Sequence, residues 1–312
     1  MIKIACYIHN EWAFGNIHHE LVKYIHPYGI DSLVLCWDKK YTNKEFTEYD
    51  QTVDLYLTTP QGTYWLLNSQ KSVPEKCITV FHSQLDLLFV KNHFSPELIE
   101  RCNGFAAVSK YLITRAKELG LDFPITHLPL GVNYNRYFYK PTDSIKTIGY
   151  AGHYISRIDH NNGVSDDNPG LYKRSFLAKE IAEELNLNFK IAQSYHNSFV
   201  TMPGYYPTVD VIICPSMNEG AGLPILEAGA AGKIILTTTV GHFPEKITIK
   251  GAIPIPYEES IFKNVCKKII SYYVKNPKAY KQKCEEVQEH AKSYDWKYCI
   301  EDWAQFIISK ST

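Results

Sequence analysis

The sequence predicts an α/β protein of two domains, each built on a parallel β-sheet covered by helices. Three observations indicate this. The chain has 312 residues, which suits two domains of roughly 100–200 residues each. Short apolar runs alternate with helical patterns, as they do in a parallel sheet whose crossovers are helices. This rhythm stops at a polar linker near residues 139–144 and then starts again.

The strands are expected at the apolar runs. In the first half these are residues 2–8, 32–37, 53–57, 78–81, 104–108 and 125–128. In the second half they are residues 147–151, 188–192, 209–214, 233–237 and 252–255. The first strand should lead through a loop at 9–16 into a helix that starts at Ile17. A polar stretch at 159–168 predicts an exposed loop, and residues 285–308 have a helical pattern. The expected domains are residues 1–143 and 144–290, followed by a terminal helix at 291–312.

The composition of the chain disfavours some classes of binding partner. Lys plus Arg and Asp plus Glu both number 33, so no bulk basic field attracts nucleic acid, and a nucleic-acid partner is disfavoured. No apolar run approaches the ~18 residues of a membrane span, and residues 1–4 lead directly into a strand rather than a signal peptide. A cytoplasmic location is expected, with peripheral contact at the inner face of a membrane left open. The eight cysteines are dispersed and are expected to be reduced, structural thiols.

The most informative segment is residues 210–233. Its apolar strand ends at Pro215, a glycine loop follows at 219–222, Pro224 suits the first turn of a helix, and Gly232 suits its end. A glycine loop that opens a helix presents backbone N–H groups and the positive end of a dipole, which suit a diphosphate. Glu219 and Glu227 bracket this anion site, at a spacing that suits accepting hydrogen bonds from two polyol groups. The alternative is that both are ordinary loop and helix charges.

This segment resembles the retaining, nucleotide-sugar-dependent glycosyltransferases of GT-B architecture, in which two Rossmann-like domains with parallel sheets face a central cleft. The family signature is two glutamates separated by seven residues, matched here by Glu219 and Glu227. The resemblance implies that Glu219 is catalytic and contacts the donor sugar, and that Glu227 holds the nucleotide ribose. It also implies that sugar and phosphate are bound by the loop residues Gly220, Ala221, Gly222 and Leu223.

Other passages extend the resemblance over most of the chain. Residues 107–112 and 128–133 look like the family's strand, serine-capped helix and glycine turn at the end of the first domain. Residues 241–245 resemble its later glycine and Pro-Glu turn. Asp295 and Trp296 begin a terminal helix like the one that packs back on the N-terminal domain in that family.

The cations expected at the diphosphate depart from the family pattern. The family usually places Arg directly after the glycine that ends the first strand of the second domain, whereas here Gly152 is followed by His153. The phosphate-binding role is therefore carried over to Arg157 and Lys173, with Arg174 as the alternative to Lys173. The competing interpretation is that these cations form a solvated surface.

The first half contributes fewer candidates. The family places a glycine-rich loop under the donor, and Gly15 with Asn16 is the partial match here. His82 ends a strand where the family often has a histidine that contacts the transferred sugar, although a histidine there is also commonly structural. The paired His18 and His19 lack further ligands at matching spacing, so no metal site is expected.

The function implied is transfer of a hexosyl or related sugar, with retention, from a nucleotide-sugar donor to an acceptor hydroxyl. The chain has no Asp-x-Asp triplet, so we expect a reaction without metal or cofactor, by front-face displacement. The acceptor is expected to be a glycan or lipid-linked glycan, with a small molecule left open. Two alternatives stay open: a sugar-nucleotide epimerase or phosphorylase of the same fold, and a non-catalytic protein that binds a nucleotide sugar.

Overall fold

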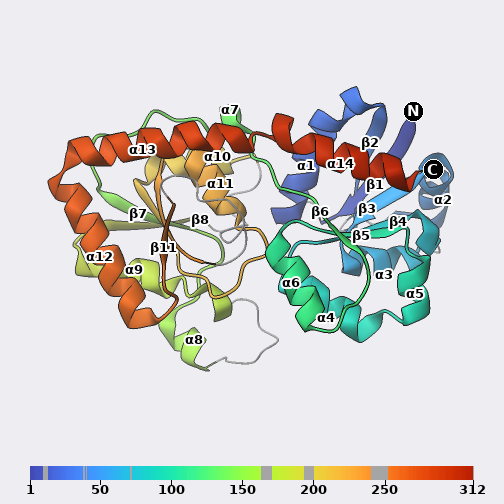
Figure 1. The fold of residues 1–312 in the computed structure, drawn as a ribbon, viewed down its shortest axis with the longest axis horizontal. Coiled ribbons are helices and arrows are strands. Elements are labelled where there is room, and N and C mark those ends of the chain that lie inside the picture. Colours follow the sequence, from blue (N-terminus) through green and yellow to red (C-terminus); the bar gives the residue numbers. More distant parts are fainter. Residues whose placement is uncertain are drawn as a thin grey trace. The chain divides into compact units, whose positions relative to one another are not determined.

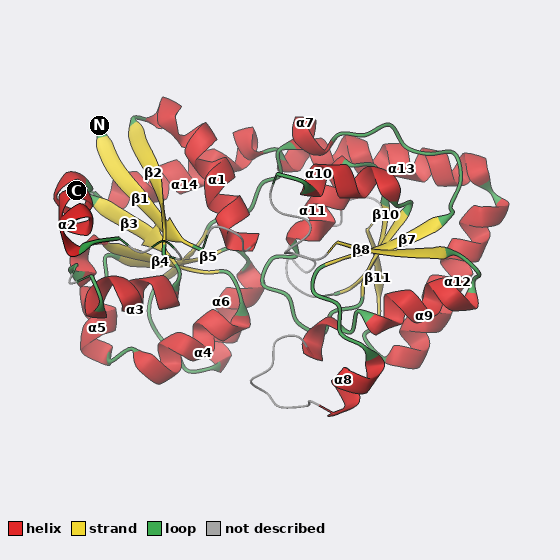
Figure 2. Cartoon of the chain, turned by 180° about the vertical axis from the view of Figure 1, so that it is seen from behind, coloured by secondary structure: helices red, strands yellow, loops and turns green. Residues whose placement is uncertain are grey.

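The computed structural model describes residues 1–9, 13–37, 39, 41–70, 72–162, 171–192, 200–239 and 252–311. The chain forms two compact units (Figure 1): unit 1 is Met1–Gly131 with Trp296–Thr312, and unit 2 is Val132–Asp295. In each unit the strands lie at the centre, between helices (Figure 2). The chain thus leaves unit 1 after Gly131 and returns after Asp295, whereas the sequence placed the divisions after residues 143 and 290.

Unit 1 contains six parallel strands in the order β2-β1-β3-β4-β5-β6. Each coincides with a predicted apolar run or lies within two residues of it. Their bounds are β1 (Ile2–Ile8), β2 (Ile30–Cys36), β3 (Leu55–Thr58), β4 (Cys77–Phe81), β5 (Gly104–Ala107) and β6 (Ile125–His127). In this register Ile4 lies between Ser32 of β2 and Leu55 of β3. Both faces of such a sheet are covered, which is why its strands are continuous apolar runs.

The helices of unit 1 start at recognisable caps. Ser83 and Ser109 accept hydrogen bonds from the backbone three residues on, at the starts of α4 and α6, as N-cap serines do. The helices are α1 (Ala13–Ile25), α2 (Asn43–Thr52), α3 (Pro60–Asn68), α4 (Gln84–His93), α5 (Pro96–Arg101), α6 (Lys110–Glu118) and α14 (Trp296–Lys310), with short 3-10 helices η1 (His26–Tyr28) and η2 (Pro74–Lys76).

Helix α1 corrects one expectation. It begins at Ala13 and not at Ile17, so residues 13–16 of the predicted loop are helical, while residues 10–12 lie outside the described residues. A single glycine costs a helix only about 1 kcal/mol relative to alanine, and packing of the buried Leu21 and Ile25 compensates for Gly15.

Helix α14 belongs to unit 1, where it packs against α1. Its apolar face is buried, with Trp303 fully inaccessible and Trp296 1% exposed. The predicted helix at 285–308 is not continuous: α13 ends at Ala291, and the 3-10 helix η6 (Lys292–Tyr294) and Asp295 separate it from α14. Gly131 is needed at this return point, because a Cβ there would lie 2.7 Å from the indole of Trp296.

Unit 2 contains five parallel strands in the order β11-β10-β9-β7-β8. Their bounds again lie at the predicted runs: β7 (Thr147–Ala151), β8 (Asn188–Ala192), β9 (Val211–Cys214), β10 (Ile234–Thr238) and β11 (Ala252–Ile255). Counted from its first strand, this sheet has the second-first-third-fourth-fifth order of unit 1. The order reverses between β1 and β3 in unit 1 and between β7 and β9 in unit 2.

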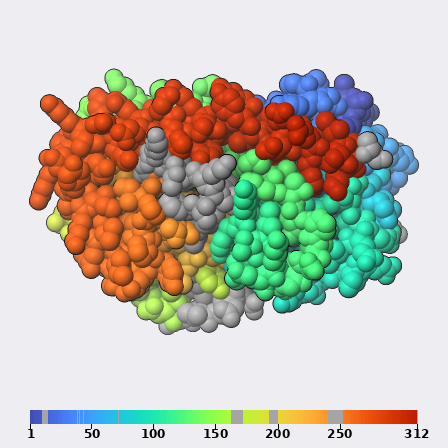
Figure 3. All heavy atoms as spheres, in the orientation of Figure 1, coloured from blue at the N-terminus to red at the C-terminus, as the bar shows by residue number. Residues whose placement is uncertain are grey.

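Helices cover both faces of the second sheet. Helix α9 packs on β7 and β8 and contacts α12, while α11 and α13 contact each other and β10. Figure 3 shows α12 and α13, in orange, on the surface of unit 2. The helices are α7 (Tyr134–Tyr137), α8 (Arg157–Asn162), α9 (Phe176–Glu184), α10 (Met202–Tyr205), α11 (Leu223–Ala230), α12 (Glu259–Lys275) and α13 (Pro277–Ala291), with η3 (Leu171–Lys173) and η4 (Tyr206–Thr208).

Three further expectations concern the fold class, the polar stretch at 159–168 and the cysteines. The α/β fold with two parallel sheets is confirmed. The polar stretch at 159–168 is not wholly a loop, because residues 159–162 lie in α8; residues 163–168 fall outside the described residues, as do residues 241–245. All eight cysteines are buried thiols. Within the described part of the chain, every helix is too short or too polar to cross a membrane.

Candidate functional site

The site predicted in unit 2 lies at the carboxyl ends of β7 and β9. These are the neighbouring strands between which the strand order reverses, and α/β proteins bind ligands beside such a reversal. Gly152 follows β7 with a φ of +150°, a conformation that favours glycine. Strand β9 leads through Pro215 into the loop at residues 219–222.

The loop enters α11 as the sequence predicts. Gly222 is the N-cap, with a φ of +72° and a ψ of +48°, so the left-handed conformation explains glycine at this position. Pro224 lies in the first turn, and Gly232 follows the helix end with a φ of +66°. Residues 220–222 are buried, which places the positive end of the α11 dipole in partly desolvated surroundings where an anion is favoured.

Glu219 is held by two donors on one carboxylate oxygen. The hydroxyl of Ser216 donates to Oε1 at 2.7 Å, and the ammonium of Lys173 lies 2.7 Å from the same atom. The Glu219 side chain is 18% exposed and that of Lys173 is 33% exposed. The backbone N–H of Met217 donates to the carbonyl of Tyr172, which fixes η3, and hence Lys173, against the loop.

The other two candidate cations make different contacts. Arg174 is buried, and its guanidinium donates to the backbone carbonyls of Pro215 at 2.8 Å and of Tyr257. Arg174 also has a φ of +46°, a conformation that costs a non-glycine residue about 1–2 kcal/mol. Its side chain thus joins the end of β9 to the segment after β11, and of the pair Lys173 and Arg174 it is Lys173 that contacts Glu219.

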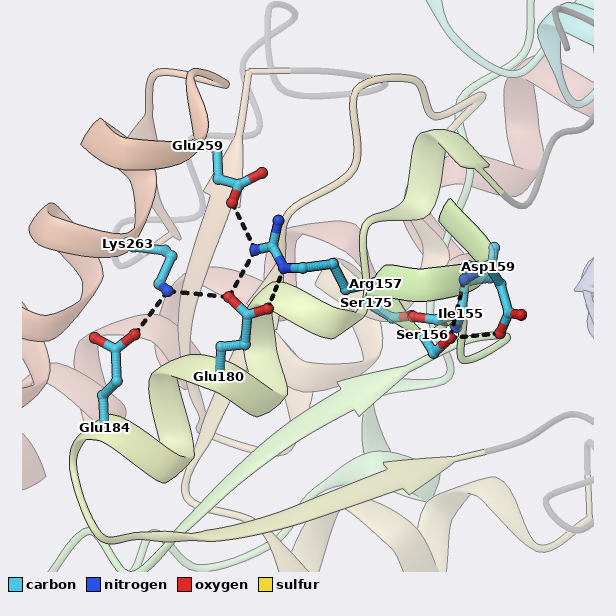
Figure 4. Close-up of polar contacts among 9 residues, drawn as sticks. All are labelled: Ile155, Ser156, Arg157, Asp159, Ser175, Glu180, Glu184, Glu259 and Lys263. Atoms are coloured by element: carbon cyan, nitrogen blue, oxygen red, sulfur yellow. Dashed lines mark hydrogen bonds and ion pairs between the residues drawn. The ribbon is translucent and has the colours of Figure 1, made fainter. Parts of the chain in front are cut away.

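Arg157 lies at the start of α8 inside a cluster of charges (Figure 4). Its guanidinium donates to Glu180 of α9 at 2.7 Å and to Glu259 of α12 at 2.6 Å, and it stacks over the ring of Phe176. Lys263 of α12 joins the cluster by binding Glu180 at 3.0 Å. These contacts connect α8, α9 and α12. The two carboxylates raise the pKa of Arg157, and its charge is therefore already balanced within unit 2.

Glu227 is almost fully buried, with 4% exposure. The hydroxyl of Tyr137 donates to Oε1 at 2.8 Å and that of Tyr206 donates to Oε2 at 2.6 Å. Burial raises the pKa of Glu227 to about 7; the two hydroxyl hydrogen bonds and the nearby charge of Arg136 act in the opposite direction. Sequence reasoning missed both tyrosines and Ser216, and nothing in the local sequence distinguishes these tyrosines from the other 21 of the 23 in the chain.

The candidates of the first half all lie in unit 1. Gly15 and Asn16 are in the first turn of α1, at the end where β1 leads into that helix. His82 follows β4, and its backbone N–H donates to Asp86 at 2.7 Å. Its ring lies edge-on to that of His18, with centroids 5.4 Å apart. Burial, together with the charge of His18, lowers the pKa of His82, so its imidazole is neutral near pH 7.

Among the residues that the structure describes, histidine, cysteine, aspartate and glutamate side chains form no group of three or more that could hold a metal ion. The acidic groups of the candidate site, Glu219 and Glu227, instead accept hydrogen bonds from the protein's own side chains.

Comparison with known proteins places this geometry in context. Residues 174–271 match the family model "Glycosyl transferases group 1". The matched segment begins at Arg174, directly after Lys173, and includes the loop at 219–222 and Glu227. No curated protein sequence matches the chain.

Solved structures resemble the chain over nearly its whole length. Sucrose-phosphate synthase from Thermosynechococcus elongatus has a TM-score of 0.69 at 14% identity, covering 99% of each chain. Anabaena HepE in complex with UDP and glucose has a TM-score of 0.65 at 14% identity, covering 99% of this chain and 100% of that one. The catalytic domain of Arabidopsis thaliana starch synthase IV, bound to ADP and acarbose, has a TM-score of 0.63 at 11% identity, covering 100% and 99%. At such identities the likeness shows the fold alone, which is the GT-B fold of glycosyltransferases.

Proposed function

We propose that this protein is a retaining glycosyltransferase that moves a hexosyl or related sugar from a nucleotide-sugar donor to an acceptor hydroxyl. The observation that carries the proposal is the arrangement at the end of β9, where Glu219 is held by Lys173 and Ser216 beside the start of α11. The match of residues 174–271 to a glycosyltransferase family model supports it, as does the GT-B fold.

In this proposal the start of α11 and Lys173 bind the diphosphate. Cleaving the bond between the anomeric carbon and the phosphate oxygen leaves additional negative charge on the diphosphate. Preorganised N–H groups and a cation stabilise such charge without reorganisation at the moment of reaction. The residues proposed to contact the donor here are Gly220, Ala221, Gly222, Leu223 and Lys173, with no metal or cofactor required.

Lys173 is the preferred cation of the three because its side chain is held less firmly than those of Arg157 and Arg174. Among the residues that the structure describes, its charged partner is Glu219, in an ion pair that is partly open to solvent, whereas Arg157 is held by two carboxylates and Arg174 by two carbonyls. A bound diphosphate would offer Lys173 a second anion, and the carboxylate of Glu219 would then accept hydrogen bonds from the donor sugar.

In this proposal each glutamate binds a different polyol group of the donor. Glu219 in the loop binds the sugar and is the proposed catalytic residue, and Glu227 in α11 binds the ribose. From unit 1 we propose that Gly15 and Asn16 contact the donor and that His82 contacts the transferred sugar through its neutral imidazole, which donates from one nitrogen and accepts at the other.

Retention follows in this proposal from front-face displacement. The acceptor oxygen attacks the anomeric carbon on the face that the phosphate leaves, and the departing phosphate oxygen takes the acceptor proton. The carbon–oxygen bond to phosphate breaks as the new glycosidic bond forms, so charge and atoms balance without a protein nucleophile. The proposed acceptors are glycans or lipid-linked glycans, with small molecules as the alternative.

The experiment begins with donor binding and then tests transfer. A thermal-shift screen of UDP, ADP, GDP and their sugars identifies the donor, because a ligand that binds the native state raises its apparent stability. With that donor and a panel of glycan acceptors, Lys173→Met and Glu219→Gln should each reduce kcat about 100-fold or more. Lys179→Met is the matched control, since Lys179 pairs with Glu183 on the exposed face of α9, and it should keep wild-type transfer.

Three outcomes discriminate the alternatives. Product with inverted anomeric configuration by NMR would refute the retaining mechanism. Isomerised or phosphorolysed donor in the absence of acceptor would indicate an epimerase or phosphorylase. Nucleotide-sugar binding without any turnover, unaffected by Glu219→Gln, would indicate a binding protein.

A further inference from the structure

The carboxylate of Glu227 lies between two tyrosine hydroxyls that come from segments of unit 2 far apart in the sequence. Tyr137 ends α7, directly after the chain enters the unit, and Tyr206 begins η4, just ahead of β9. Each hydroxyl donates to a different carboxylate oxygen, at 2.8 Å and 2.6 Å. All three side chains are at least 95% buried.

The tyrosine rings are themselves fixed. The rings of Tyr137 and Tyr206 meet edge to face, with centroids 5.8 Å apart and planes at 72°, and Tyr205 packs against Tyr206 with centroids 5.3 Å apart. Aromatic pairs in this geometry attract each other beyond their buried area. The two hydroxyls are therefore held in place by packing, and they set the plane of the carboxylate between them.

The arrangement leaves acceptor capacity unused. An ionised carboxylate offers about four lone-pair sites, and the two tyrosines occupy one on each oxygen. With respect to the described part of the chain, each oxygen thus retains capacity for one further donor, and the two oxygens together match the paired hydroxyls of a ribose.

A purely structural role, in which Glu227 only connects α7 to α11, explains its carboxylate less well. Burying a carboxylate is costly unless a cation compensates it. The two hydrogen bonds that described residues donate to Glu227 come from neutral hydroxyls, and the nearby charge of Arg136 offsets the effect of burial only in part. A glutamine in the same position would connect α7 to α11 at a lower cost. A carboxylate that is kept here at this cost, with one acceptor site open on each oxygen, indicates a ligand that needs it.

We propose that Tyr137 and Tyr206 are positioning residues that hold Glu227 for the 2′ and 3′ hydroxyls of the donor's ribose, and that they thereby set the preference of the site for ribonucleotides over 2′-deoxyribonucleotides. This rests on the proposed function. Neither tyrosine need touch the nucleotide.

The test measures binding of nucleoside diphosphates by calorimetry to Tyr137→Phe and Tyr206→Phe. The probes are UDP, ADP and GDP, each with its 2′-deoxy counterpart, between pH 6 and pH 9. Tyr205→Phe is the matched control, because Tyr205 is equally buried and adjacent, but its hydroxyl donates to the backbone carbonyls of Tyr150 and Lys190, both at 3.1 Å.

We expect each of the two variants to bind the preferred ribonucleotide about tenfold more weakly, the effect of one lost hydrogen bond to a charged group. Their binding of the 2′-deoxy counterpart should fall less, so that the ratio of the two affinities shrinks. Loss of either hydroxyl raises the pKa of Glu227, so the pH midpoint of ribonucleotide binding should move upward by about one unit. Tyr205→Phe should keep the wild-type ratio and midpoint.

The outcomes separate the two proposals. If the wild-type protein binds no nucleoside diphosphate, the proposed function fails. If it binds and both tyrosine variants keep the wild-type ratio and pH midpoint, or if Tyr205→Phe changes them equally, the positioning role is refuted while the proposed function stands. Should either variant fail to fold by circular dichroism, the other carries the test. Calorimetry of the wild-type protein in two buffers of different ionisation enthalpy adds a measurement without substitution, which should show proton release when nucleotide binds near pH 7.

Discussion

The buried carboxyl of Glu227 makes a prediction about stability that is independent of any ligand. Burial raises the pKa of this group from its ordinary value of 4.5 to about 7 in the folded protein. Below pH 4.5 the group is protonated in both states, and above that value the unfolded chain ionises first. The folded state therefore loses stability as the pH rises from about 4.5 to about 7.

The size of the loss follows from the two pKa values. At about 1.4 kcal/mol for each unit of pKa, the interval from 4.5 to about 7 corresponds to a limit of about 3 kcal/mol. Between pH 5.5 and pH 7.5, the range that is convenient to measure, the contribution of Glu227 to the free energy of unfolding should fall by about 2 kcal/mol.

Urea unfolding of the wild-type protein and of Glu227→Gln at pH 5.5, 6.5 and 7.5 measures this contribution. The difference between the two free energies of unfolding should change by about 2 kcal/mol across the series, with wild type losing stability relative to the variant. Glu183→Gln is the matched control, because Glu183 is 62% exposed, and its curve should stay parallel to wild type. A Glu227→Gln curve parallel to wild type would refute the reasoning.

Three further predictions concern the same unit. Gly222→Ala should lower the free energy of unfolding by about 1–2 kcal/mol in urea titrations, because alanine is strained at a φ of +72°; unchanged stability would contradict the conformation. Arg157→Met should lower the melting temperature more at low than at high salt while leaving nucleotide affinity within about twofold, whereas a tenfold loss of affinity in calorimetry would show that this guanidinium reaches the donor. Burial raises the pKa of the Cys214 thiol to about 12, so this thiol should react with a disulfide reagent only after unfolding, and rapid reaction in the native protein, followed by peptide mapping, would disprove its burial.

The strands could be predicted from the sequence because each is a continuous apolar run, buried on both faces of a parallel sheet. The start of α11 at Gly222 and Pro224 and its end at Gly232 could be predicted, because local backbone chemistry determines where such a helix begins and ends. The start of α1 could not be predicted from the sequence. Packing of the buried face of this helix stabilises it by more than the low helix propensity of Gly15 destabilises it. The strand order of the sheets was also beyond the sequence, because pairing depends on crossovers that no local pattern specifies.

The contacts of the candidate site were less predictable than the fold. The sequence offered Arg157 and Lys173, with Arg174 as the alternative to Lys173. It could not show their contacts, because their partners lie far away in the chain; Glu259, for example, lies 102 residues beyond Arg157. The same holds for Tyr137, which is separated by 90 residues from Glu227. The motif singled out Glu219 and Glu227 as candidates, and tertiary structure was needed to identify which side chains hold them.

The return of the chain to unit 1 has a consequence for how the protein is made. Unit 2 is continuous in sequence, whereas unit 1 requires Trp296–Lys310, which the ribosome synthesises after all of unit 2. Until then the surface of α1 that α14 covers, including the contact between His18 and Trp303, is exposed on the nascent chain. Unit 2 can therefore complete its core during translation, while the apolar face of α1 stays open until α14 docks. An exposed apolar surface of this kind is where chaperones and aggregation compete, so the docking of α14 determines when unit 1 becomes native.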